Sequence, residues 1–168
     1  MFDIGEYIIY GKNGVCRLVD IGGSPFDEND TRTYYVLKPL GSNGVIYTPV
    51  DNSSIASRKL MKKSEIEEFI KKIPSICELT VENEKNRREI YKSAVAELTP
   101  EGYVSVIKTV RGRRLAFENL RRHITETDAE YESLAKKSLY SEISVVMGIP
   151  FDEIENFIAE KIAKLQKA

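Results

Sequence analysis

The 168-residue sequence has few of the side chains that most reactive sites need: it has no tryptophan, one histidine and two cysteines. A metal site needs clustered Cys and His ligands, and His123 lies far in sequence from both Cys16 and Cys77. We therefore expect no metal ion and two reduced thiols in the core. No Ser-His-Asp or Cys-His set with a local signature is present. The sequence thus predicts neither an enzyme nor a cofactor or small-molecule substrate.

Long apolar runs are also absent. No stretch of about 18 apolar residues is available to span a membrane. Met1–Gly5 lacks the basic start and apolar stretch of a signal peptide. With 42% hydrophobic and 30% charged residues, the composition is that of a soluble globular protein. We expect a cytoplasmic protein without a membrane partner.

The net charge of −1 hides a segregated pattern. Between Lys85 and Arg122, ten Lys and Arg stand against four Glu, a net charge of +6. Between Glu126 and Glu160, two Lys stand against nine Asp and Glu, a net charge of −7. A neutral chain can in this way present a basic surface.

Residues 1 to about 57 predict short strands. The β-branched and aromatic runs are 7–10, 15–21, 33–37 and 45–48. Lys12-Asn13-Gly14 predicts a hairpin turn, because Asn and Gly both accept positive φ. A phosphate-binding loop is the alternative for Gly11–Gly14, but the glycine spacing does not match one. Short strands with tight turns favour a small barrel.

From about residue 62 the apolar spacing becomes helical. Five helices are predicted: one capped by Ser64 with Glu67 and ended by Pro74, then 81–98, 103–123, one from Thr125 or Thr127 to near Gly148, and one starting at Pro150. The expected fold class is α+β in two domains, with a β-rich domain at 1–60 and an all-α helical domain at 61–168.

Two surfaces are candidates for binding. An edge strand can pair with a partner's strand, and Arg32 and Tyr47 are expected near such an edge. A solvated edge that charged residues protect from pairing is the alternative, and the pattern alone favours it. On the helices, clustered cations such as Lys85, Arg87 and Arg88 could neutralise DNA phosphates. A solubilising surface explains the same residues, and the pattern alone leaves both readings open.

Several stretches resemble the CarD/CdnL family of bacterial RNA-polymerase-binding transcription regulators. They are FDIGEYIIYGKNGVCRLVDIGG, TYYVLKPLGSNGVIYTPVDNSSIASRKLM, NRREIYKSAVAEL and DAEYESLAKKSLYSEISVVMGI. The resemblance implies a Tudor-like β domain that pairs a strand edge with the polymerase β subunit. It also implies a helical domain that contacts promoter DNA, largely independently of sequence, and changes open-complex stability and initiation. Association with the nucleoid through the polymerase would follow.

The resemblance also places site residues on this chain. The polymerase-facing residues are expected at Arg32, Val45, Ile46, Tyr47, Thr48 and Pro49. The DNA-facing residues are expected at Lys85, Arg87, Arg88, Tyr91, Lys92, Lys108, Arg111, Arg113 and Arg114.

The missing tryptophan is a departure from the family pattern. Relatives place a Trp wedge in the minor groove, at a position that falls here near Asn86 or Arg87. Tyr91, one turn further on, could substitute for the wedge, although packing within the helix is the competing role. Without a wedge, melted DNA would be stabilised weakly.

Two other functions compete with transcription regulation. A protein-only adaptor or dimerising module would use the basic stretch to bind acidic protein, including the acidic stretch of a second copy. An enzyme is the third class, and no catalytic residues support it.

Overall fold

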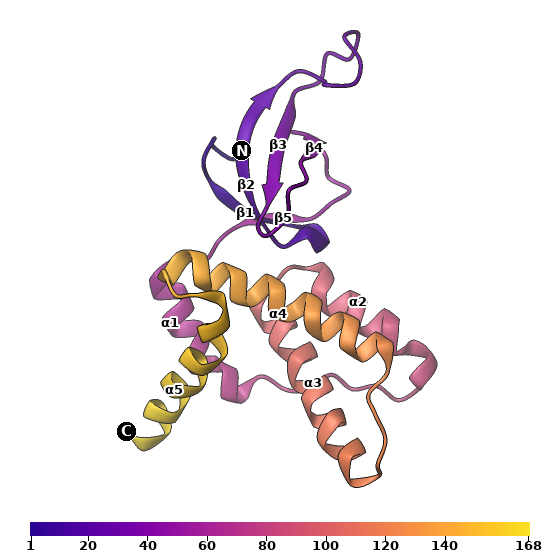
Figure 1. Cartoon of the computed structure of the whole chain (residues 1–168), viewed down its shortest axis with the longest axis vertical. Coiled ribbons are helices and arrows are strands. Elements are labelled where there is room, and N and C mark those ends of the chain that lie inside the picture. Colours follow the sequence, from indigo (N-terminus) through magenta and orange to yellow (C-terminus); the bar gives the residue numbers. More distant parts are fainter. The chain divides into compact units, whose positions relative to one another are not determined.

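The computed structural model describes all residues, 1–168. The chain forms two compact units, Met1–Leu60 and Met61–Ala168, which are described separately. The first is a sheet and the second is built of helices (Figure 1). This confirms the α+β layout expected from the change in apolar spacing near residue 62.

Unit one is a five-stranded antiparallel sheet with the order β4-β3-β2-β1-β5. Its strands are β1 (Tyr7–Tyr10), β2 (Val15–Gly22), β3 (Tyr34–Pro39), β4 (Ile46–Pro49) and β5 (Ser57–Lys59). The first four fall where the alternating runs predict them. Three-residue β5 follows the stretch that the sequence analysis assigned to strands.

The β1–β2 connection is a turn, but its geometry differs from the predicted Asn-Gly hairpin. Gly11–Asn13 form a single 3₁₀ turn. The left-handed φ values belong to Gly11 at +48° and Gly14 at +67°, whereas Asn13 has none. The two glycines that bracket the turn therefore supply the conformational freedom that it needs.

The sheet curls around one apolar core, in which Ile8, Leu18 and Leu37 are buried. The buried Tyr10 hydroxyl on β1 donates to Thr48 Oγ1 on β4 at 2.8 Å, although two strands separate β1 from β4 in the sheet. Such a contact requires strong curvature. The ladder does not close into a ring, because β4 and β5 end the strand order.

Unit two contains five α-helices. They are α1 (Lys63–Lys72), α2 (Arg87–Ala96), α3 (Pro100–Asn119), α4 (Glu126–Met147) and α5 (Ile154–Lys167). Helix α4 packs against all four others (Figure 1). Its buried residues, among them Tyr131, Leu139 and Ile143, lie at the centre of this core.

Two helices begin at residues other than those predicted, because their N-terminal caps differ from the predicted caps. Thr99 and Pro100 were expected to end a helix, but they begin α3: the Gly102 amide donates to Thr99 Oγ1 at 3.1 Å, and Pro100 occupies the first turn. Helix α1 is capped by the Glu65 carboxylate, which accepts from the Lys62 amide, rather than by Ser64. The cap of α4 by Thr125 and its end at Gly148 agree with the prediction.

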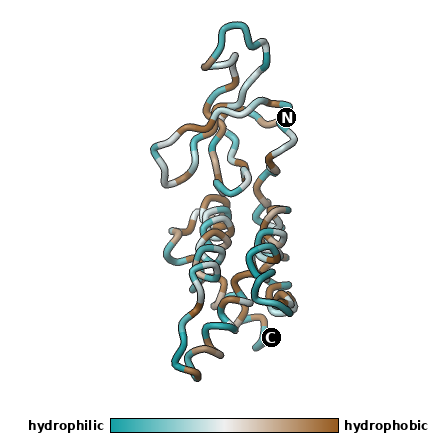
Figure 2. Tube along the Cα trace, turned by 90° about the vertical axis from the view of Figure 1, so that its right-hand side faces the viewer, coloured by the Kyte–Doolittle hydropathy of each residue, from teal (hydrophilic) through white to brown (hydrophobic).

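Hydropathy along the chain follows this architecture. The connection between β2 and β3 is largely hydrophilic, and apolar segments concentrate in strands and helices (Figure 2). Cys16 is buried as expected, but Cys77 is exposed, which corrects its assignment to the core. It follows the 3₁₀ turn Ile73–Ser75 that ends α1 and lies in an irregular segment. None of the helices has the length and apolarity needed to cross a membrane.

Candidate functional site

The two edges of the sheet differ in charge. Strand β5 carries Arg58 and Lys59, and the Lys59 ammonium pairs with Glu6 at 2.9 Å. No charged residue occurs from Gly41 to Val50, the stretch that contains β4. Proteins commonly blunt an exposed edge with charge. The β4 edge, Val45–Pro49, lacks this protection, and no other strand of the sheet covers it.

Side chains along β4 alternate between the core and solvent. Thr48 is buried, and Ile46 packs against the core. Tyr47 and Val45 are 41% and 47% exposed. Phe26 from the β2–β3 connection, itself 75% exposed, contacts the Tyr47 ring edge to face at 5.5 Å. The β4 edge therefore presents an aromatic pair to solvent, and an aromatic pair is typical of binding surfaces.

Arg32 lies close to this edge but is already paired. It precedes Thr33, whose carbonyl accepts from the Val50 amide just beyond β4. Its guanidinium donates to both carboxylate oxygens of Asp30, from Nη2 at 2.7 Å. The hydrogen bonds from Arg32 and from the Tyr34 hydroxyl lower the pKa of Asp30. Arg32 would have to exchange this carboxylate for a partner's.

In the helical unit, a buried carboxylate accepts hydrogen bonds from two of the predicted DNA-facing side chains, Tyr91 and Arg113. Asp128 has no exposed surface. It accepts from the Tyr91 hydroxyl at 2.7 Å, from Arg113 Nε at 2.8 Å, and from the amide and hydroxyl of Thr125 at 2.9 Å. Burial alone would raise the pKa of Asp128, but these hydrogen bonds outweigh it and the pKa lies below its ordinary value.

Glu84 extends this network to two arginines. Arg87 binds it through Nε and Nη2 at 3.0 and 2.8 Å, and Arg113 binds it through Nη1 and Nη2 at 2.7 and 2.9 Å. Arg87 also donates to the Tyr91 hydroxyl at 2.8 Å and is only 8% exposed. These contacts lower the pKa of Glu84 to about 2, with the Arg87 bond the largest cause. We name Glu84, Arg87, Tyr91, Arg113 and Asp128 the Asp128 network.

Other predicted DNA-facing cations also have partners in the chain. Arg88 pairs with Glu130 at 2.9 Å, and Arg114 pairs with Glu132 at 2.5 Å. The Lys108 ammonium donates to two backbone carbonyls at the end of α1, those of Ile73 and Ile76. The acidic helix α4 therefore neutralises much of the basic stretch that precedes it.

Three of the predicted DNA-facing residues remain exposed without an ion pair: Lys85, Lys92 and Arg111. Tyr91 is fully buried, with its ring 5.7 Å from that of Tyr131, so it packs within the helical unit. Of the two roles considered for Tyr91 from the sequence, packing within the helical unit is the one that agrees with its position.

The sequence analysis missed the partners of these arginines. Glu84 stands three residues before Arg87, a spacing at which side chains on one helical face meet. Asp128 stands three residues after the Thr125 cap, the position that completes a capping box. Both spacings were visible in the sequence. Phe26 carried no comparable signal, since the contact with Tyr47 depends on the path of the β2–β3 connection.

An uncharged sheet edge with exposed aromatic side chains is typical of a protein-interaction surface. Residues 2–60 match the CarD-like/TRCF RID domain family, a protein-interaction family that binds the RNA polymerase β subunit. The first unit of the chain is therefore a domain of this family, as the sequence motifs of the first 60 residues predicted. The match ends where the first compact unit ends. No curated protein matches the chain.

Proposed function

We propose that this protein is a non-enzymatic transcription regulator whose Tudor-like first unit adds the β4 edge to a strand of the RNA polymerase β subunit. The observation that carries this proposal is the absence of charge from Gly41 to Val50 beside an edge that no other strand covers. In strand addition, main-chain hydrogen bonds give affinity and side-chain contacts give specificity. Tyr47 and Phe26 supply such contacts next to the edge.

The test is binding of the full chain to a fragment of the polymerase β subunit. We expect Tyr47→Glu to weaken binding by roughly 30-fold or more, since truncating an aromatic hot spot costs at least about 2 kcal/mol. The matched control is Ile55→Glu, because Ile55 is 40% exposed against 41% for Tyr47 and precedes β5 at the opposite edge. Equal loss in both variants, or none in Tyr47→Glu, argues against the β4 edge.

For the second unit, we propose largely sequence-independent contact with promoter DNA through exposed cations. Lys85 and Lys92 are free for phosphate, whereas Arg88 would have to exchange Glu130 for it. Such contacts are weak on a chain with a net charge of −1. Attachment to polymerase raises the local concentration of this unit near the promoter, so weak contacts suffice.

Salt dependence tests the DNA contact. Each neutralised phosphate contributes about −0.9 to the slope of log K against log salt concentration. We expect Lys85→Gln with Lys92→Gln to reduce the slope by roughly 2. Lys63→Gln with Lys72→Gln on α1 is the matched control and should leave it unchanged. Substituting Arg87 is uninformative, because loss of its buried contacts also disturbs the fold.

Promoter opening depends on the wedge position. Tyr91, the candidate replacement for the missing tryptophan, is buried in the Asp128 network, and Asn86 and Lys85 are the exposed residues beside the expected position. We therefore propose that this protein has no aromatic wedge and stabilises the open complex only weakly. Promoter melting by purified polymerase should change little in extent when the protein is added, and strong stabilisation would contradict this proposal.

One observation favours the alternative of a protein-only adaptor: most arginines of the basic stretch already pair with carboxylates of the same unit. This alternative predicts that the chain binds polymerase but shows no salt-dependent DNA binding. A change of mass in solution would identify its dimeric form.

A further inference from the structure

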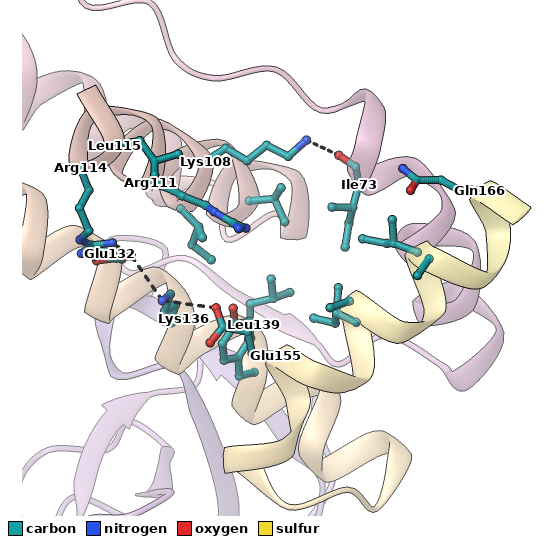
Figure 3. A pocket seen from close by; sticks show the side chains of 17 residues that line it. Ile73, Lys108, Arg111, Arg114, Leu115, Glu132, Lys136, Leu139, Glu155 and Gln166 are labelled. Carbon is teal, nitrogen blue, oxygen red and sulfur yellow. Dashed lines mark hydrogen bonds and ion pairs between the residues drawn. The ribbon is translucent and has the colours of Figure 1, made fainter. Parts of the chain in front are cut away.

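The helical unit contains a cavity of about 600 Å³ between α3 and α5, with α4 as its floor (Figure 3). Most of its wall is apolar. The buried part includes Ile73, Val104, Leu139 and Tyr140, and Ile158 and Ile162 line the α5 side. Apolar surface left in a concave site of this size is a common feature of ligand pockets.

Six charged side chains line the cavity, and five of them have partners in the chain. Lys108 is held by backbone carbonyls, and Arg114 by Glu132. Lys136 lies 3.3 Å from Glu132 and 3.7 Å from Glu155. The carboxylates of Glu132 and Glu155 are therefore already paired with cations of the chain.

Arg111 is the exception. It makes no hydrogen bond or ion pair with another residue of the chain. Its side chain extends from α3 into the cavity, and its guanidinium lies within the space that the labelled residues surround (Figure 3). A guanidinium that faces an apolar cavity without a carboxylate is a ready partner for an anion, because charge-assisted hydrogen bonds are the strong ones.

Tyr140 is a second polar group on the same wall. Its ring is buried, and its hydroxyl makes no hydrogen bond within the chain. Burial raises the pKa of Tyr140 to about 12, so the hydroxyl stays protonated and can donate. Arg111 and Tyr140 together offer donors of the kind that a carboxylate accepts.

We propose that this cavity binds a small amphipathic carboxylate, with the acid group on Arg111 and an alkyl chain over the α4 floor between α3 and α5. This ligand is neither a substrate nor part of the proposed polymerase and DNA contacts.

The cavity volume of about 600 Å³ lies within the range of roughly 300–1,000 Å³ that small-molecule sites occupy. A single unpaired cation likewise matches one acid group.

Calorimetric titration of the full chain with decanoate, below the concentration at which decanoate forms micelles, tests the proposal. We expect saturable binding at one site. Arg111→Gln should weaken it by roughly tenfold or more, the usual effect of losing a charged hydrogen bond. Ala163→Phe, which fills the cavity from α5, should abolish it. Decan-1-ol should bind more weakly than decanoate.

Lys92→Gln is the matched control, since it removes an exposed, unpaired cation from α2, outside the cavity. It should bind decanoate as the unmodified chain does. Circular dichroism must show the same helix content with and without ligand. The proposal is overturned if decanoate binds without saturation, if Arg111→Gln binds unchanged, or if decan-1-ol binds equally well. Light scattering that shows a dimer disrupted by Ala163→Phe would overturn it in favour of a second copy.

Discussion

Asp128 shows how a charge is kept in the interior of this protein. It lies in the first turn of α4, where the helix dipole favours a carboxylate, and it accepts hydrogen bonds from three residues. One of these donors, Arg113, is also bound to Glu84. The capping box of α4 and the ion pairs of α2 and α3 are therefore parts of one network.

Replacing Asp128 with Asn tests this network. The amide keeps the volume but removes the charge and directs an NH₂ group at donors. We expect a loss of about 3–5 kcal/mol in the free energy of unfolding, because a buried partner of an arginine is removed. Urea unfolding followed by circular dichroism measures it. Glu130→Gln, two residues later on α4 and exposed, should cost less than about 1 kcal/mol. Similar losses in both variants would contradict the account.

Acid should also weaken the Asp128 network. The pKa of Glu84 lies at about 2 in the folded chain and at an ordinary value of 4.5 otherwise. A lowered pKa contributes stability that is complete above the ordinary value and is lost as the pH falls through the folded value. We expect the free energy of unfolding to decline from about pH 5 to about pH 2.

The Glu84→Gln variant should show a shallower decline over the same pH range in urea titrations. Glu84 is 62% exposed, so high salt should reduce the difference between the two proteins. A decline of equal steepness in both would exclude Glu84 as the source.

At the scale of elements, two glycines of α3 give opposite expectations. A Cβ on Gly102 would overlap the Ala94 carbonyl oxygen of α2, whereas the three atoms nearest to a Cβ on Gly112 all belong to the Glu78 carboxylate. Backbone cannot move aside, but the end of a flexible side chain can. Gly102 therefore lies where the backbones of α2 and α3 approach closely.

Matched alanine variants measure this difference. Each gains up to about 1 kcal/mol in helix propensity. Gly112→Ala should be neutral or stabilising, and Gly102→Ala should lose about 1–3 kcal/mol or more through overpacking. Thermal unfolding followed by circular dichroism distinguishes them, and a stabilised Gly102→Ala would refute the close approach.

For the whole molecule, the expectation is two independent folding units. Each has its own buried cluster, around Leu37 in one and Leu139 in the other. A unit of 60 residues is the less stable, because a small domain buries only about 60% of its surface. Because the chain has two hydrophobic cores, its two units can unfold in two separate transitions.

Fragments test this independence. We expect residues 61–168 alone to keep helical circular dichroism and a cooperative unfolding transition. Residues 1–60 should bind the polymerase β fragment as tightly as the full chain, with a lower melting temperature. A fragment 61–168 without a cooperative transition would show that the units depend on each other. Reduced polymerase binding by 1–60 would assign part of that surface to the helices.

Local pattern determined much of this protein. The alternating runs predicted β1 to β4, and the helical spacing predicted five helices, because side-chain direction repeats every 2 residues in a strand and every 3.6 in a helix. The motifs at 2–60 predicted the RID family. Helix starts were less predictable, since Thr99-Pro100 is compatible with either a loop or a cap.

Tertiary structure alone decided which charges are free. Ten cations between Lys85 and Arg122 have equal standing in the sequence, yet Arg87 is buried, Arg114 is neutralised by Glu132, and Arg111 extends into a cavity. Glu132 comes from α4, and its contact with Arg114 of α3 depends on how those helices cross. The unpaired β4 edge was decided in the same way, by its place at the end of the strand order. Coulomb interactions depend on distance in space, which composition and periodicity do not specify.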